Sequence, residues 1–312
     1  MRIGVDVGGT KIEAALMNSD GELTMRRRIA TPRSDYAAAV GAITDIVREV
    51  EKQAGRTCSV GFCIPGTISP ATGKVKNAHN SPFNDHFLDK DIESALGRPI
   101  RMVNDANCFA LSEAVDGSAA GAKIVFGAIL GTGCGGGVVI NGKPLIGENA
   151  IAGEWGHNIM PWMQDDEMPG LPCTCGNTGC IETFLSGTGF AAHHRQETGE
   201  NLTPADIAAR AAKGDTVCDA SLTRYENRLA RALSSVINLI APDVIVLGGG
   251  VSNIERLYEN VPRYWAKWIF SDHVSTRLVA PKFGDSSGVR GAAWLWSEGE
   301  GEDAVPQRRT AP

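Results

Sequence analysis

The sequence lacks the long apolar runs and the basic clusters on which membrane proteins and nucleic-acid-binding proteins depend. No stretch is apolar over the roughly 18 residues that a membrane span needs. The longest basic run is Arg26–Arg28, and 30 basic against 36 acidic side chains give a formal net charge of −6. Binding to nucleic-acid phosphates needs clustered lysine and arginine. We therefore expect neither a membrane nor a nucleic acid among the partners.

The N-terminus also lacks the pattern of an export signal, because Met1-Arg2 is followed directly by a strand-like segment, Ile3–Asp6. Without such a signal, the eight cysteines indicate packing or metal binding in a reducing compartment rather than disulfides. These features predict a cytoplasmic protein. Its 312 residues and 43% hydrophobic composition suffice for two folded lobes and exclude general disorder.

Hydrophobic periodicity predicts that strands and helices alternate along the chain. The predicted strands cover residues 2–7, 11–17, 23–30, 58–64, 99–103, 124–130, 138–140 and 243–247. The predicted helices cover residues 36–54, 105–115, 221–240, 254–269 and 288–296. A long irregular segment is expected from the hairpin turn at 141–142 to about residue 189.

The order of elements in the two halves follows one βββαβα plan, which predicts a duplicated α/β fold of two lobes. We assign residues 1–117 to an N-terminal lobe and 118–287 to a C-terminal lobe. The helix within 288–297 is expected to pack back on the N-terminal lobe. The Gly/Glu/Pro-rich residues 298–312 are expected to form a disordered tail.

Glycine is abundant, with 37 residues, and three glycine clusters follow predicted strands. The first cluster lies within Asp6-Val-Gly-Gly-Thr-Lys11, which presents a carboxylate, backbone amides, a hydroxyl and an ammonium group within six positions. Glycines let amide groups approach an anion closely, and the polar side chains can hold phosphate or hydrated Mg²⁺. The alternative is a purely structural turn.

Two common nucleotide-binding motifs fail on their context. The G-x-G-x-x-G pattern of residues 131–136 is followed by a strand, whereas a dinucleotide-binding fold needs a helix there. Gly4 and Gly9 have the spacing of a P-loop, but Thr10-Lys11 reverses the required order. We therefore expect neither a Rossmann fold nor a P-loop fold.

The glycine motifs resemble those of the actin-like sugar kinases, and the segment from Leu130 to His157 resembles the signature of the ROK family. The resemblance covers Arg2 to Trp296. Within the family the chain is similar to bacterial fructokinases in several further segments. These segments are Asn104–Asn107, Glu113–Gly117, Glu154–His157, Pro161–Met163, Ser186–Phe190 and Gly284–Gly291. The resemblance implies a two-lobed, actin-like (ribonuclease-H-like) ATPase fold.

The resemblance also implies an ATP- and Mg²⁺-dependent hexose kinase, most similar to a fructokinase, which converts D-fructose to D-fructose 6-phosphate. It places a first phosphate motif in the N-terminal lobe, and a second phosphate motif and an adenosine motif in the C-terminal lobe. Asp6 would hold Mg²⁺ through water. A homodimer is the default oligomer. The implied ATP-binding residues are Gly4, Asp6, Gly8, Gly9, Thr10, Lys11, Gly131, Thr132, Gly133, Gly135, Gly136, Gly137, Gly248, Gly249 and Gly250.

Asp105 is the candidate general base, because it lies where a predicted strand ends and a helix begins. Ligands bind at such strand ends, and phosphoryl transfer to a hydroxyl needs a proton acceptor. The residues alone leave open that Asp105 only caps the helix, and the resemblance assigns it the catalytic role. The predicted sugar-binding residues are Asn80, Asn104, Asp105, Glu154, His157 and Glu182.

His157, Cys173, Cys175 and Cys180 form a Cys₃His set of the kind that binds tetrahedral zinc. From the residues alone, the alternative is a group of buried cysteines without metal. The resemblance implies a structural zinc.

Three functional alternatives remain beside fructose phosphorylation. One is phosphorylation of another hexose (mannose, glucose or N-acetylglucosamine), since such sugars differ by one hydroxyl or substituent. The second is a sugar-responsive regulator without catalysis, for which no helix-turn-helix is visible ahead of Arg2. The third, an actin-like ATPase without a sugar substrate, does not account for the Cys₃His set.

Overall fold

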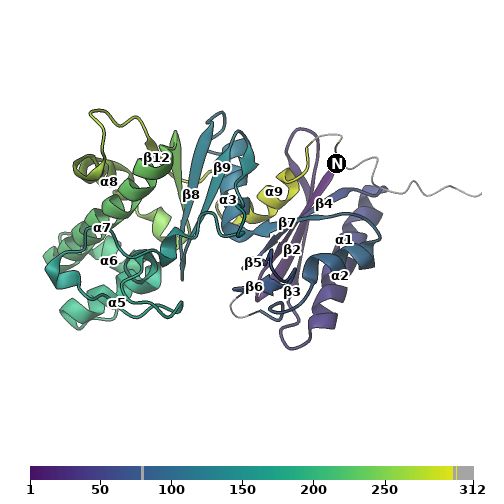
Figure 1. Ribbon diagram of the computed structural model, residues 1–312, viewed down its shortest axis with the longest axis horizontal. Coiled ribbons are helices and arrows are strands. Elements are labelled where there is room, and N and C mark those ends of the chain that lie inside the picture. The colour runs from purple at the N-terminus through teal and green to yellow at the C-terminus, as the bar shows by residue number, and fades with distance from the viewer. Residues whose placement is uncertain (79–80, 298–299, 301–312) are drawn as a thin grey trace, which may run out of the picture. The chain divides into compact units, whose positions relative to one another are not determined.

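The computed structural model describes residues 1–78, 81–297 and 300, which form two compact units (Figure 1). The first unit comprises Met1–Asp116, Gly142–Ala152 and the described residues from Asp285 onward, and the second comprises Gly117–Asn141 and Gly153–Gly284. Residues 142–152, which the sequence analysis places in the C-terminal lobe, thus belong to the first unit. The expected tail, apart from Glu300, lies outside the described residues. The expected α/β class is confirmed, with two five-stranded sheets.

The sheet of the first unit has the order β3-β2-β1-β4-β7, with β1–β3 antiparallel and β1, β4 and β7 parallel. Strands β1 and β2 are almost entirely buried, whereas half-buried and exposed residues alternate along β3, and all three match their predicted bounds. The short β5 and β6 form a separate hairpin. The strands are β1 (Arg2–Val7), β2 (Lys11–Met17), β3 (Leu23–Ala30), β4 (Ser59–Ile64), β5 (Thr67–Ile68), β6 (Val75–Lys76) and β7 (Arg101–Asn104).

Helices α1 (Tyr36–Ala54) and α2 (Leu88–Leu96) lie side by side in the first unit (Figure 1). Asp35 caps the start of α1 by accepting a hydrogen bond from Ala38 N–H, and Gly55 ends it at a φ of 68°. Both helices bury apolar side chains with β1 and β4 in one core. Helix α2 and strands β5 and β6 were not predicted from the sequence.

Helices α3 (Asp105–Val115) and α9 (Ser287–Trp294) pack against each other, and α9 also packs on β1 and β4. The backbone of α9 lies so close to the backbones of α3, β1 and β4 that glycine is required at the contacts. A Cβ atom at Gly4 would lie 1.9 Å from Val289 O, one at Gly61 would lie 1.9 Å from Ala292 O, and one at Gly291 would lie 1.8 Å from Cys108 O. These glycines therefore seat the last helix directly against the backbone of the first unit.

The sheet of the second unit has the order β10-β9-β8-β11-β12. The strand predicted at 138–140 begins four residues earlier, because β9 starts at Cys134 and Gly135–Gly137 pair with β8. At Gly136 the small size serves close packing rather than a turn, because a Cβ there would lie 2.6 Å from Gly153 O. The strands are β8 (Ile124–Leu130), β9 (Cys134–Ile140), β10 (Lys143–Pro144), β11 (Val244–Gly248) and β12 (Arg277–Val279).

Five helices of the second unit share one hydrophobic core with its sheet. They are α4 (Ile181–Leu185), α5 (Gly187–Thr198), α6 (Pro204–Ala211), α7 (Thr216–Ile240) and α8 (Leu257–Trp265). The predicted bounds were wrong for two of them. Helix α7, capped by Asp215, begins five residues before the predicted start, and α8 gives way to a 3₁₀ turn at Ala266–Trp268. Helices α4 and α5 begin within the stretch predicted to be irregular.

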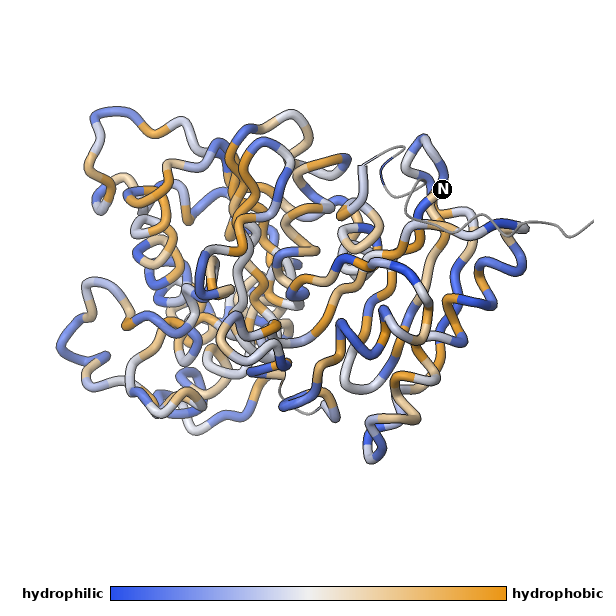
Figure 2. The backbone as a smooth tube through the Cα atoms, turned by 45° about the vertical axis from the view of Figure 1, so that its right-hand side comes forward, coloured by the Kyte–Doolittle hydropathy of each residue, from blue (hydrophilic) through white to orange (hydrophobic). Residues whose placement is uncertain are grey.

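Figure 2 shows the central strands as mainly hydrophobic tube, in agreement with the buried apolar clusters of each unit. None of the helices within residues 1–78, 81–297 and 300 combines the length and the apolar character that a bilayer span requires.

Candidate active site

Asp6 lies at the end of β1 in a row of side chains that crosses the sheet of the first unit. Cys63 and Glu13 are its cross-strand partners, and Glu13 pairs with Arg28. Opposed residues share a face of the sheet, here the face on which α9 packs. Burial raises the pKa of Asp6, although a hydrogen bond from the Cys63 thiol and the nearby Lys11 ammonium lower it. A carboxylate at such a strand end is suited to orienting the water shell of Mg²⁺.

Asp105 begins α3, as predicted, and Asn104 ends β7, one residue beyond the predicted end of the strand. The N-cap is Asn104, whose Oδ1 accepts the Ala106 N–H at 2.9 Å and whose Nδ2 donates to Gly66 O at 3.0 Å. Asp105 is exposed, and its Oδ1 shares the Ala106 N–H at 2.8 Å. Asn104 is thus the N-cap residue, although Asp105 shares its hydrogen bond, and the catalytic role of Asp105 stays a prediction. A sugar contact by Asn104 stays a prediction, and Asn80 lies outside the described residues.

The turn Gly131–Gly133 joins β8 and β9, and Glu182 on α4 holds it. Glu182 Oε2 accepts the N–H of Cys134 at 3.0 Å, and a Cβ at Gly133 would lie 2.8 Å from that oxygen. The other end of the turn is fixed because Gly131 O accepts the N–H of Gly187 at 2.6 Å. Glu182 therefore supports the predicted second phosphate turn, a function that the sequence analysis did not anticipate. Its predicted sugar contact is a separate proposal.

A cavity of about 580 Å³ lies in the second unit beside this turn. Three predicted ATP-binding residues, Gly131, Thr132 and Gly250, line it. Gly249 packs behind them at a φ of 79°, where a Cβ would lie 2.5 Å from Leu130 O. The volume is within the range of small-molecule pockets. The other lining residues are Leu130, Gly187, Thr188, Ala191, Asn201, Leu202, Thr203, Pro204, Ala205 and Val251.

The cavity also meets the N-termini of α5 and α6, through Gly187-Thr188 and Thr203–Ala205. Helix N-termini carry partial positive charge, which favours anionic ligands. The sequence analysis did not assign these residues to the nucleotide. The segment Ser186-Gly-Thr-Gly was part of the family resemblance, and this signal could have identified Gly187 and Thr188.

The predicted zinc ligands His157, Cys173, Cys175 and Cys180 come together in the second unit. Their ligand atoms all lie within 4.8 Å of one another. Cys173 Sγ is 3.6 Å from His157 Nδ1, and Cys175 Sγ is 3.6 Å from Cys180 Sγ. Ligands about 2.3 Å from a tetrahedral zinc are separated by ~3.7 Å, so the donor set fits the ion.

The backbone around the cysteines is folded into paired turns rather than left as an open loop. Cys173 N–H donates to Asn177 O at 2.8 Å, and Gly176 curls the chain at a φ of 91°. Isolated bridges join Ile159 to Cys180 and Pro172 to Thr178. Cys173 Sγ also lies 3.6 Å from Glu182 Oε1, so Glu182 lies between the metal-type cluster and the Gly131–Gly133 turn.

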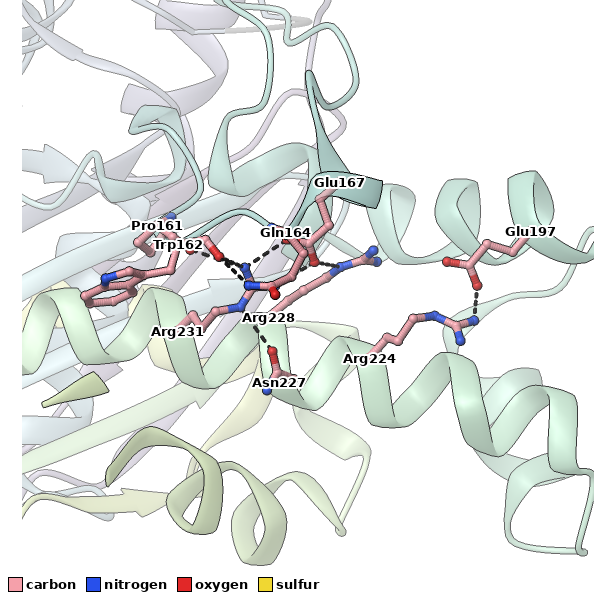
Figure 3. Close-up of polar contacts among 9 residues, drawn as sticks. All are labelled: Pro161, Trp162, Gln164, Glu167, Glu197, Arg224, Asn227, Arg228 and Arg231. Atoms are coloured by element: carbon pink, nitrogen blue, oxygen red, sulfur yellow. Dashed lines mark hydrogen bonds and ion pairs between the residues drawn. The ribbon is translucent and has the colours of Figure 1, made fainter. Parts of the chain in front are cut away.

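Glu167 anchors the segment that leads into the cysteine cluster (Figure 3). Arg228 Nε donates to Glu167 Oε1 at 2.8 Å, and Arg231 Nη1 and Nη2 donate to the two oxygens at 2.8 and 2.6 Å. Arg231 Nη1 also binds Trp162 O at 2.6 Å. Burial tends to raise the pKa of Glu167, but the hydrogen bonds from Arg231 and Arg228 lower it to about 2. The three side chains fasten this segment to α7.

Several predicted site residues lie neither in a turn nor at the cavity. Most of them are glycines within strands. Gly4 lies in β1 under α9, and Gly135–Gly137 lie in β9. Glu154 is exposed immediately before the 3₁₀ turn Trp155–His157, and His157 is half-buried. The predicted ATP contacts of these glycines, and the predicted sugar contacts of Glu154 and His157, therefore stay predictions.

Comparison with known proteins gives one family along nearly the whole chain. The model described as "ROK family" matches residues 2–299. The N-acetyl-D-glucosamine kinase of Photobacterium profundum is 42% identical over 95% of this chain and 99% of its own length. Seven further relatives with 36% to 40% identity carry the same name. These relatives support the alternative substrate N-acetylglucosamine better than fructose.

Solved structures agree with the expected actin-like ATPase fold. The ROK hexokinase from Thermus thermophilus has a TM-score of 0.83 and 28% identity, covering 94% of this chain and 96% of its own. A ROK family glucokinase from Streptomyces griseus, solved with glucose and AMPPNP, has a TM-score of 0.73 and 28% identity. That comparison covers 94% of this chain and 98% of the glucokinase.

Proposed function

Because this chain belongs to the ROK family and is an ATP-dependent sugar kinase, we propose that its substrate is N-acetyl-D-glucosamine, which it phosphorylates at the 6-hydroxyl. The observation that carries the choice of sugar is the agreement of eight relatives, 36% to 42% identical, on that substrate name. No such support exists among them for fructose.

In the proposed reaction, Asp105 accepts the proton of the 6-hydroxyl as its oxygen attacks the γ-phosphorus of ATP. The bond between that phosphorus and the β–γ bridging oxygen breaks, and ADP leaves. Asp105 is suited to this role because it is exposed at the carboxyl end of β7 while Asn104 caps the helix. Asp6 would orient Mg²⁺ through water, which neutralises charge on the phosphates.

The second unit supplies a cavity of about 580 Å³ suited to the nucleotide, with two helix N-termini on its wall. We assign Gly131, Thr132 and Gly250 to ATP on this basis. Glu154, His157 and Glu182 are assigned to sugar hydroxyls, which imidazole and carboxylate groups can bind. A zinc held by His157 Nδ1 and three thiolates would leave Nε2 of His157 available to a sugar hydroxyl.

An ADP-coupled assay with equal concentrations of N-acetylglucosamine, glucose, mannose and fructose tests the proposed substrate. We expect kcat/KM for N-acetylglucosamine to exceed that for fructose by at least about tenfold, since a pocket shaped for the acetamido group loses contacts with other sugars. A higher kcat/KM for fructose would restore the original prediction, and ATP turnover with none of the sugars would reject the proposed substrate class.

A further inference from the structure

The turn between β1 and β2 is held by the residues that follow β3. Thr31 Oγ1 donates a hydrogen bond to Gly8 O at 2.7 Å. Arg33 Nε donates to Gly9 O at 2.9 Å. Thr31 N–H donates to Thr10 O at 3.1 Å. Every carbonyl group of the turn is therefore occupied by a donor from residues 31–33.

These bonds determine what the turn can offer to a ligand. Gly8 N–H donates to Lys11 O at 2.8 Å within the turn. Among the described residues, nothing accepts a hydrogen bond from the N–H groups of Gly9 and Thr10. The turn thus offers two amide donors and no carbonyl acceptor, which is the pattern that attracts an anion.

Peptide planarity links each occupied carbonyl to one of these amides. In a trans peptide, the C=O of one residue and the N–H of the next lie in one plane and point in opposite directions. Gly8 O and Gly9 N–H share one peptide group, and Gly9 O and Thr10 N–H share the next. Holding the two oxygens from one side therefore directs the two N–H groups to the other side.

We propose that Thr31 and Arg33 are positioning residues of the first phosphate turn, which fix two peptide planes so that Gly9 and Thr10 donate to a nucleotide phosphate. The proposal rests on the proposed ATP-dependent activity. Without these bonds either plane could rotate and present a carbonyl oxygen, which repels phosphate. Thr31 is buried and Pro32 has a fixed φ, so this segment is stiff enough to hold the turn. Neither Thr31 nor Arg33 was a predicted site residue.

Calorimetric titration with Mg-ADP, in the absence of sugar, tests the proposal. Thr31→Val replaces the hydroxyl with a methyl group of the same shape, and we expect the Kd for Mg-ADP to rise roughly 5–10-fold, as for one lost hydrogen bond. Thr31→Ser keeps the hydroxyl and should bind within about twofold of the wild type. The matched control is Thr44→Val, because Thr44 is also buried in the first unit and its hydroxyl donates to Gly41 O in α1.

Arg33→Lys and Arg33→Ala extend the test to an exposed position where folding is not at risk. Lysine keeps the charge but has no Nε–H donor at the same place, so both variants should weaken Mg-ADP binding. Wild-type affinity in Thr31→Val and both Arg33 variants, or an equal loss in Thr44→Val, would overturn the proposal. If the variants weaken Mg-ADP binding as expected but the wild-type protein phosphorylates no sugar, the proposed substrate is refuted and this inference is still supported.

Discussion

Asp105 carries the chemistry of the proposed reaction at the scale of one residue. Asp105→Asn removes the proton acceptor, and we expect kcat to fall by roughly 10²–10⁴, the usual contribution of a general base. The Mg-ATP and sugar affinities should stay within a few-fold, because the amide keeps the shape of the side chain. Steady-state kinetics with separate binding titrations provide the measurement. Near-normal turnover of Asp105→Asn would show that Asp105 is not the general base.

Glu167 is a single residue on which local stability depends. Its pKa is lowered to about 2 from an ordinary 4.5, because Arg231 and Arg228 bind the carboxylate despite its burial. A lowered pKa stabilises the fold above the ordinary value, and this stability is lost as the pH falls from about 5 toward 2. At neutral pH, Glu167→Gln should destabilise the protein by about 3 kcal/mol, since two buried guanidinium groups lose their counter-charge.

Chemical denaturation of wild-type protein and Glu167→Gln at several pH values measures this effect. The difference in unfolding free energy should be constant from pH 7 to about 5 and should shrink at pH 3. Arg263→Gln is a suitable control, because the Arg263–Glu259 pair is exposed on α8 and contributes little. If the two proteins differed equally in unfolding free energy at pH 7 and pH 3, the lowered pKa of Glu167 would be contradicted.

At the scale of elements, α9 depends on glycine where it meets its neighbours. Gly291→Ala would place a Cβ atom 1.8 Å from Cys108 O, a backbone atom that cannot move without shifting α3. We expect a loss of about 3 kcal/mol in unfolding free energy, as for an overpacked core. Gly41→Ala in α1 is the matched control, because nothing lies within 4 Å of its Cβ position and alanine favours a helix by up to about 1 kcal/mol. Equal thermal stability of the two variants would contradict the packing seen for α9.

The cysteine loop is the second element on which a prediction depends. We expect about one tightly bound zinc per chain by elemental analysis, held by His157 and the three cysteines. Cys175→Ser should lower the metal content and the thermal stability and raise the sugar KM several-fold, because the metal would orient His157. The nucleotide KM should stay nearly unchanged, because Cys175 does not line the nucleotide-sized cavity.

Thr174→Ser, an exposed change in the same loop, controls for general disturbance. Metal-free protein with full activity, or Cys175→Ser with unaltered sugar kinetics, would refute the zinc assignment.

At the scale of the whole molecule, the bounds of β1–β3 could be predicted because strand-forming residues between glycine-containing turns are local information. Helix α2 was missed because only Leu88 and Ile92 of its nine residues are buried, which leaves a weak periodic signal. The start of β9 was predicted four residues too late because a glycine needed for close packing, such as Gly136, has the same sequence signal as one needed for a turn.

The site residues show the same limit. Asp105 and the zinc ligands could be proposed from motifs, because their spacing and chemistry are visible in the chain. The roles of Glu182 toward Cys134, and of Thr31 toward Gly8, depend on contacts 48 and 23 residues apart in sequence. Such contacts follow from tertiary packing, which no local pattern encodes.

The first unit is built from both ends of the chain, and this has a consequence for its synthesis. The ribosome delivers β1 to α3 early, but α9, which fills the face formed by Gly4 and Gly61, is delivered last. Trp296 then closes the arrangement by donating to Val60 O at 2.8 Å while its own carbonyl accepts from Arg2. Domains usually mature from the N-terminus during translation. Here we expect the second unit to complete its fold first, because its whole sequence is available while the nascent first unit still lacks α9.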